Sequence, residues 1–206
     1  MATVLVTASD TGVGKTRVAG MVARALAARG HTQVIKPVEA GAPAGHPQDA
    51  VLAAGDWAQP HTLISLPLAL APLAEGQGGL SLDDLLRRLR ELPAADHRVI
   101  EGAGGVAVPL DASGSDWVDF AHAIQPDLVI IVVDDRLGAI NQARLAAGYL
   151  AARFPDIRLG IWLNAVHADP APALARANRA GMVAAGLHLV GESAHGAAQP
   201  SLMHLP

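Results

Sequence analysis

Residues 3–16 read TVLVTASDTGVGKT, an apolar run followed at once by a loop that contains two glycines and a lysine. This pattern predicts a strand over residues 3–8, and the Ala- and Leu-rich residues 15–29 predict a helix that ends before Gly30. A phosphate site needs consecutive backbone N–H groups, a helix N-terminus behind them, a lysine for the outer phosphates and a hydroxyl for Mg²⁺. The run Gly12–Thr16 supplies these parts, so the stretch predicts a nucleotide-phosphate loop.

The loop is a variant of the usual phosphate-binding motif. The strict pattern has a glycine five positions before Gly14, where this chain has Ser9. An ordinary strand-to-helix turn remains the alternative interpretation. The choice of lysine favours function: of fifteen basic residues only Lys15 and Lys36 are lysine, and the rest are arginine. A position that keeps lysine against this bias is expected to need a compact ammonium group on a flexible stem, although chance is the other explanation.

Composition favours one enzyme-like domain over residues 1–206, because 51% hydrophobic residues provide a substantial core. A net charge of −4 offers no basic field for a polyanion, so we expect a small-molecule partner and no nucleic acid. The chain opens without an export signal and its apolar runs are short, which predicts a cytoplasmic protein with no membrane partner. The absence of cysteine excludes disulfides and thiolate chemistry.

Short apolar runs alternate with helix-period stretches along the chain, which predicts a mostly parallel central sheet with helices on both faces. The fold class is therefore α/β and P-loop NTPase-like. Residues 42–79 are rich in Pro and Gly, and we expect loops and short helices there, over the edge of the active site. Further strands are predicted at 33–36, 97–101, 128–133, 157–163 and 187–190, and further helices at 82–91, 138–153 and 172–185.

Two further motifs place charged side chains where predicted strands end, which is where open parallel sheets bind ligands. Lys36 ends the strand 33–36, and Glu101 ends the strand 97–101 just before the glycine-rich residues 102–105. Mg²⁺ prefers a few hard oxygen ligands together with phosphates and waters, so we expect Thr16, Glu101 and Asp49 to form its site. A solvated Lys36 and acids without a metal are the alternatives that remain open.

Other polar residues carry no clear signal. The nine histidines lack metal-ligand spacing, so we expect them on the surface or at caps. The pair Asp134 and Asp135, after the strand 128–133, is predicted to be a solvated strand end rather than a second acidic site.

Together these motifs resemble the dethiobiotin synthetase family, which carries T-D-T-x-x-G-K-T, K-P-V-x-T/S-G, E-G-A-G-G and L-G-x-x-N segments in this order. The chain has SDTGVGKT at 9–16, KPVEAG at 36–41, EGAGG at 101–105 and LGAIN at 137–141. The resemblance implies an ATP- and Mg²⁺-dependent ligase of biotin synthesis. Such an enzyme joins CO₂ to 7,8-diaminopelargonate through a phosphorylated carbamate and closes the ring of dethiobiotin. It also implies a homodimer.

The resemblance also implies roles for single residues. Lys15 would hold the outer phosphates, Lys36 would stabilise the carbamate and γ-phosphate, and Thr11 would lie beside the substrate. Asn164 matches the asparagine that reads adenine. Mg²⁺ would sit on Thr16, Asp49 and Glu101. The implied nucleotide-binding set is Gly12, Val13, Gly14, Lys15, Thr16, Arg17, Asp49, Glu101, Gly102, Ala103, Gly104 and Asn164.

Three departures from the family pattern leave alternatives open. Ala8 replaces a glycine, Ala40 replaces a hydroxyl that faces the substrate, and residues 191–195 read GESAH where the family has a G-E-I-P-type segment. A divergent ligase or carboxylase on another substrate is therefore the main rival. A regulatory ATPase of the MinD/ParA kind is disfavoured, because Asp10 and Thr11 stand where that class has its signature lysine. An inactive binding module is disfavoured by the complete lysine and acid set.

Overall fold

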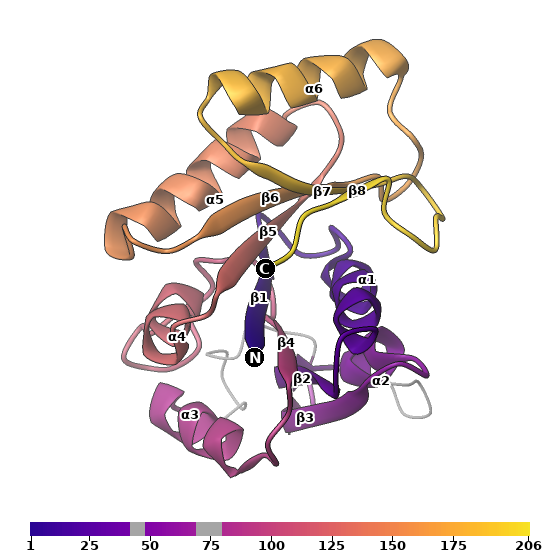
Figure 1. Ribbon diagram of the computed structural model, residues 1–206. Helices are drawn as coiled ribbons and strands as arrows, with labels where there is room; N and C mark the ends of the chain where they lie inside the picture. The colour runs from indigo at the N-terminus through magenta and orange to yellow at the C-terminus, as the bar shows by residue number, and fades with distance from the viewer. Residues whose placement is uncertain (42–47, 69–79) are drawn as a thin grey trace.

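A computed structural model of the chain describes residues 1–41, 48–68 and 80–206. In this part of the chain eight strands form one sheet in the order β3-β2-β4-β1-β5-β6-β7-β8, which Figure 1 shows at the centre of the molecule. Neighbouring strands are parallel except β7 and β8. The strands are β1 (Ala2–Ala8), β2 (Thr32–Ala40), β3 (Gln59–Leu66), β4 (His97–Glu101), β5 (Leu128–Asp134), β6 (Leu159–Asn164), β7 (Leu189–Ser193) and β8 (Leu202–Met203).

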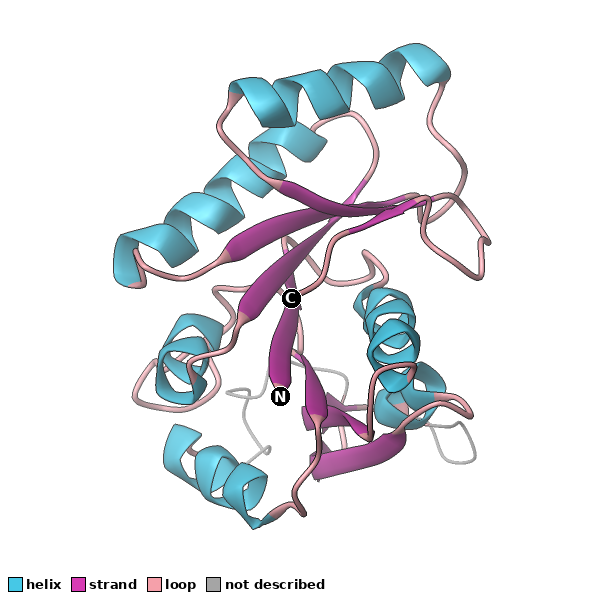
Figure 2. Cartoon of the chain, in the orientation of Figure 1, coloured by secondary structure: helices cyan, strands magenta, loops and turns pink. Residues whose placement is uncertain are grey.

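Helices cover both faces of this sheet (Figure 2). One face packs on α1 (Lys15–Ala27) and α2 (Asp49–Ala54). The other packs on α3 (Leu82–Glu91), α4 (Trp117–Ile124), α5 (Ala139–Arg153) and α6 (Pro172–Ala184). The predicted mostly parallel sheet with helices on both faces is therefore confirmed. None of the helices in the described ranges has the length and apolar character to cross a membrane.

The central strands are buried on both faces, which explains their sequences. All seven residues of β5 are buried, and six of them are Leu, Val or Ile. Continuous runs of β-branched residues suit strands that have helices above and below. Strand β1 lies between β4 and β5, so the loop that follows β1 emerges at the middle of the carboxyl edge of the sheet. This edge carries the candidate site.

The predicted strands are present, with altered ends. The strand expected at 33–36 is longer, at Thr32–Ala40, and those expected at 157–163 and 187–190 are displaced toward Leu159–Asn164 and Leu189–Ser193. The expected helices form, with Ser81 accepting the N–H of Asp84 as the N-cap of α3. Helix α4 was not predicted, because its eight residues are too few for a clear helical period.

The expectation of only loops and short helices over 42–79 is wrong for residues 59–66, which form strand β3. This strand lies at the edge of the sheet, where its polar residues stay half-exposed and where Pro60 does not interrupt a ladder on both sides. An edge strand therefore lacks the apolar run that identifies a central strand. The short helix α2 agrees with the expectation, while residues 42–47 and 69–79 lie outside the described part of the chain.

Two expectations about polar residues are also wrong. Asp134 and Asp135 are buried rather than solvated. Asp134 accepts the backbone N–H of Val166, and Asp135 accepts a 2.6 Å hydrogen bond from Asn178 of α6. Of the histidines expected at the surface or at caps, His97 is buried where β4 begins. The partners of the two aspartates are distant in sequence, so the local pattern does not reveal them.

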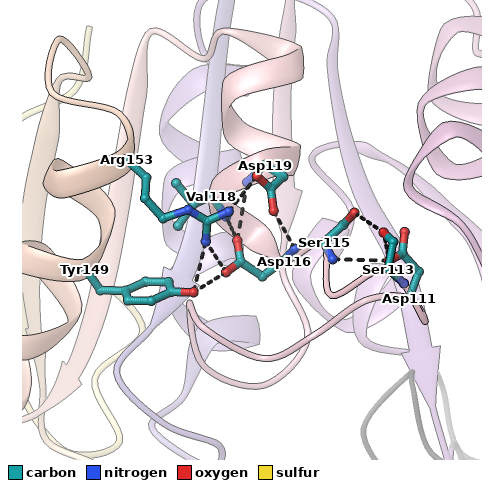
Figure 3. Close-up of polar contacts among 8 residues, drawn as sticks. All are labelled: Asp111, Ser113, Ser115, Asp116, Val118, Asp119, Tyr149 and Arg153. Carbon is teal, nitrogen blue, oxygen red and sulfur yellow. Dashed lines mark hydrogen bonds and ion pairs between the residues drawn. The ribbon is translucent and has the colours of Figure 1, made fainter.

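Figure 3 shows the polar contacts that fix the start of α4. The carboxylate of Asp116 accepts the backbone N–H groups of Val118 and Asp119 and forms a capping box with Asp119. The same carboxylate accepts hydrogen bonds from the Tyr149 hydroxyl and the Arg153 guanidinium of α5. The N-terminus of α4 is thereby tied to α5, which holds the first residue of α4, Trp117, in place below the candidate site.

Replacing Asp116 tests this connection. Asp116→Ala removes the cap and both contacts to α5, and we expect the free energy of unfolding to fall by about 1–2 kcal/mol. Urea denaturation followed by circular dichroism measures it. Asp156→Ala, at an exposed acid after α5, is the matched control. Equal stability of the two variants would show that the network in Figure 3 contributes nothing.

Candidate active site

The loop after β1 has the conformation that a bound phosphate requires. Gly12 and Gly14 have φ values of 72° and 87°, in the left-handed region that favours glycine. Helix α1 begins at Lys15, and no side chain caps the N–H groups of its first turn. These N–H groups and the positive end of the helix dipole stay available for an anion. The geometry therefore agrees with the predicted phosphate loop.

Asn164, at the end of β6, holds this loop through a hydrogen bond to its backbone. Its amide Nδ2 donates a 2.8 Å hydrogen bond to the carbonyl oxygen of Val13. A Cβ atom on Gly14 would lie only 2.3 Å from the same Nδ2. The second glycine is thus needed both for its φ value and for the close approach of the asparagine.

A cluster of charges connects the loop with Lys36, which lies in the middle of β2 rather than at a strand end, and with Glu101 at the end of β4. The Lys36 Nζ lies 2.7 Å from Glu101 Oε1 and 2.8 Å from Asp49 Oδ2. The Thr16 hydroxyl donates a 2.8 Å hydrogen bond to the same Glu101 oxygen. Burial alone lowers the pKa of Lys36, but the charges of Glu101 and Asp49 outweigh it and raise the pKa. Lys36 therefore stays charged.

The second lysine has a different environment. Lys15 is only 8% exposed, and its Nζ donates a 3.2 Å hydrogen bond to the carbonyl oxygen of Asp10. Burial, followed by repulsion from the charge of Lys36, lowers the pKa of Lys15 from 10.5 to about 8. Lys15 forms no ion pair with a carboxylate in the part of the chain that the structure describes. Its buried ammonium group is therefore suited to binding an anion such as a phosphate, which would supply the missing negative charge.

The predicted magnesium ligands are partly brought together. Thr16 and Glu101 are in direct contact, and Asp49 reaches them through Lys36. Among the described residues, the second Glu101 oxygen, Oε2, is buried and accepts no hydrogen bond. It therefore remains available as an oxygen ligand for a metal ion. In the ranges that the structure describes, no cluster of three or more His, Cys, Asp or Glu residues could hold a metal ion. These few oxygens fit Mg²⁺ that is held mainly by phosphates and waters.

These residues surround an open cavity of about 640 Å³. Ten of the predicted site residues line it, whereas Val13, Arg17, Gly102 and Asn164 lie behind or beside it. Glu39, Val38 and Val108 also line it, and no role was predicted for them. Glu39 is the most informative of these, because burial and the charge of Asp49 raise its pKa. The lining comprises Thr11, Gly12, Gly14, Lys15, Thr16, Lys36, Val38, Glu39, Ala40, Asp49, Glu101, Ala103, Gly104 and Val108.

Arg17 joins the first turn of α1 to the loops after β6 and β7. Its guanidinium donates to Asn164 Oδ1 at 3.0 Å and to the carbonyl oxygens of Ala194 and Ala197 at 2.5 and 2.6 Å. The Ser193 hydroxyl donates a 2.6 Å hydrogen bond to the same Asn164 oxygen. The expected base-reading asparagine is thus buried and held by several contacts. Arg17 also lines a second hollow of about 230 Å³.

The loop that follows Glu101 is supported by Trp117, the first residue of α4. The Trp117 indole Nε1 donates a 2.7 Å hydrogen bond to the carbonyl oxygen of Ala103. A Cβ atom on Gly102 would lie 3.2 Å from the indole ring, so the glycine lets the loop rest directly on Trp117. This contact fixes the backbone that follows Glu101.

Comparisons with known proteins agree with these motifs. A family model described as an AAA domain matches residues 2–188. The ATP-dependent dethiobiotin synthetase BioD of Xanthomonas campestris pv. campestris (strain 8004) is 46% identical over 161 residues, covering 71% of each chain. The protein of the same name from Nitrosospira multiformis is 38% identical over 183 residues, covering 84% of this chain and 79% of the relative.

A solved structure confirms the fold class. The ParA family ATPase from Chlorobium tepidum TLS superposes with a TM-score of 0.57 and 16% identity, covering 93% of this chain and 83% of that one. At this identity the likeness concerns the fold alone.

The contact between Gly14 and Asn164 gives a test of the loop. Gly14→Ala combines an unfavourable φ with the clash, whereas Gly12→Ala has a similar φ and no atom within 4 Å of its Cβ. We expect both to be destabilised by about 1–2 kcal/mol from the backbone, and Gly14→Ala to lose at least about 1 kcal/mol more. Chemical denaturation measures the difference. Equal losses would mean that Asn164 does not hold the loop.

Proposed function

Because the chain belongs to the ATP-dependent dethiobiotin synthetase family, which consists of ligases of biotin biosynthesis, we propose that its open cavity is the active site. There CO₂ is joined to 7,8-diaminopelargonate with ATP, and dethiobiotin is released. One observation carries the proposal: the buried Lys36, held charged by Glu101 and Asp49, lies in the same cavity as the phosphate loop. A cation at this place can stabilise negative charge on both a carbamate and a phosphoryl group.

The reaction that we propose has three steps. One amine of the substrate adds to CO₂ and loses a proton, which gives a carbamate. A carbamate oxygen attacks the γ-phosphorus of ATP and releases ADP, so a carbamic–phosphoric mixed anhydride forms. The second amine attacks the carbonyl carbon, phosphate leaves, and a proton is lost as the ring closes. Such chemistry asks the protein mainly to align the reactants and to neutralise charge.

The residues of the cavity have distinct proposed roles. The backbone of Gly12–Thr16 cradles the phosphates, and Lys15 neutralises the outer ones. Lys36 stabilises the carbamate and the transferred phosphoryl group. Thr11, at the exposed mouth of the cavity, contacts the substrate. Lys15 and Lys36 repel each other, and a phosphate between them would relieve this repulsion.

The metal and the base have proposed positions as well. Thr16, Glu101 and Asp49 would hold Mg²⁺, which, when bound, neutralises charge on the phosphates. The free oxygen of Glu101 supports this assignment. Asn164 and Arg17 would contact the nucleotide where β6 ends, and residues 102–104 would approach it with their backbone. Ser193, in the segment that departs from the family pattern, would keep Asn164 in its orientation.

We further propose that the protein is a homodimer, which the family resemblance implies, and that it works in the cytoplasm. Leu137 and Leu145, just before and on α5, have 80% and 67% of their surface exposed, so an interface that covers them would remove apolar surface from water. Their burial between two copies would support the dimer. Sedimentation of the wild type against a Leu145→Glu variant tests the assembly.

One observation favours a second candidate substrate. Ala40 lines the cavity where the family has a hydroxyl, so one hydrogen bond to the substrate, worth about 1 kcal/mol, is missing. A ligase that acts on another amine would explain this difference. The likeness to ParA does not support a partitioning ATPase, because it concerns the fold alone and Asp10 stands where that class has its lysine.

The first test is the formation of dethiobiotin and ADP from 7,8-diaminopelargonate, bicarbonate, Mg²⁺ and ATP. We expect Lys36→Ala to reduce kcat about 100-fold or more, because a charge that stabilises the transition state is lost. Lys36→Arg keeps the charge without the compact ammonium and should restore little of the rate. Arg90→Ala, on the exposed side of α3, is the control.

Nucleotide binding separates two kinds of failure. A wild-type protein that binds ATP but makes no dethiobiotin would disprove the substrate assignment and leave the phosphate loop intact. A Lys36→Ala variant with wild-type kcat would disprove the role of Lys36.

The lowered pKa of Lys15 gives a second prediction. With a pKa of about 8, Lys15 is half protonated at pH 8 in the free protein. Bound phosphates favour the charged form, so ATP binding at this pH should take up about half a proton, and affinity should fall above it. Calorimetry in two buffers of different ionisation enthalpy measures the uptake. Lys15→Arg stays protonated, and the same uptake in this variant would contradict the assignment.

A further inference from the structure

Glu39 is a buried acid in the cavity that the roles above leave unused. It lies near the end of β2, only 6% exposed, and lines the cavity with Lys36 and Asp49. Its Oε2 accepts the backbone N–H of Asp49 at 3.2 Å, where α2 begins. Within the described residues the other oxygen, Oε1, accepts no hydrogen bond, and no cation forms an ion pair with this carboxylate.

The position of Glu39 is set by a continuous series of polar contacts. Thr16 contacts Glu101, Glu101 contacts Lys36, Lys36 contacts Asp49, and the Asp49 backbone contacts Glu39. Glu39 is therefore the member most remote from the phosphate loop along this series. Lys36 forms ion pairs with Glu101 and Asp49, the two acids nearer the loop along this series. Glu39 forms no ion pair within the described residues, so its carboxylate is the one that a cationic group of a bound ligand can pair with.

The neighbours of Glu39 in the sequence complete this end of the cavity. Val38 and Ala40 both line it, and Ala40 offers only a methyl group. Val108 and Ala103 add further apolar surface to the lining. A ligand that fits such surroundings has a positive charge attached to an aliphatic chain, because burying an unpaired carboxylate is costly and a cation offsets that cost.

We propose that Glu39 binds an ammonium group of the diamine substrate and replaces the hydroxyl that Ala40 lacks. This inference rests on the proposed function, since the diamine supplies the ammonium group. Two other roles compete with it. Glu39 could serve only to anchor the first N–H of α2, or it could be a further ligand for Mg²⁺.

Glu39→Gln separates these roles, because the amide oxygen can still accept the Asp49 N–H while the charge is lost. We expect the KM for 7,8-diaminopelargonate to rise about tenfold or more, with the KM for ATP changed less than twofold. Calorimetric binding of the diamine without nucleotide or metal should weaken by a similar factor. Glu39→Ala, which also loses the anchor, should show the same loss of diamine affinity together with lower stability.

Analogues and controls sharpen the test. Two nonanoates, one with only the 7-amino group and one with only the 8-amino group, identify the amine that faces Glu39. The analogue that lacks this amine should bind the wild type and Glu39→Gln equally. Glu91→Gln, at an exposed acid of α3, should leave every constant unchanged. Ala40→Ser in the Glu39→Gln background should recover part of the diamine affinity.

The outcomes are distinct. Unchanged diamine affinity in Glu39→Gln, or a raised requirement for Mg²⁺ with unchanged diamine KM, overturns the inference. A wild-type protein that makes no dethiobiotin but binds the diamine through Glu39 disproves the proposed function and keeps the inference. Absence of diamine binding by the wild type disproves both.

Discussion

The need to pair buried charges organises the centre of this molecule. Lys36 is almost fully enclosed, so its ammonium group is stable there only with carboxylates in contact. Glu101 and Asp49 supply them from β4 and from the start of α2, and Thr16 adds the phosphate-loop helix. Two strands and two helices must therefore meet at fixed distances. The cavity, the loop conformation and the supporting contacts all follow from this meeting point.

The sequence predicts this centre well and its surroundings poorly. Central strands such as β5 are continuous apolar runs, and the glycine-lysine loop has a spacing that few other structures need. Edge strand β3 is polar and includes Pro60, so its local pattern resembles a loop. The contact of Asp135 with Asn178 joins residues 43 positions apart, and that of Glu39 with Asp49 joins a strand to the next helix. Local periodicity contains no information about such tertiary contacts.

The departure from the family pattern at the end of β7 has a structural counterpart. Trp162 Nε1 donates to the Ser193 hydroxyl, which donates to Asn164 Oδ1, while Asn164 Nδ2 donates to the Val13 carbonyl oxygen. The Ser193 hydroxyl thus links the buried indole of Trp162, through Asn164, to the phosphate loop. Chains of this kind polarise one another and favour one rotamer of each member. The residue that replaces the family pattern therefore contributes to the loop as well as to the strand.

The near-absence of lysine has a consequence for the chemical reactivity of the whole surface. Both lysines are in the cavity, 8% and 4% exposed. Reagents that acylate lysine side chains therefore find no ammonium group on the outer surface of the described residues. Lysine acetylation has no exposed side chain on which to act. A label that does reach Lys15 would report that the cavity has opened to solvent.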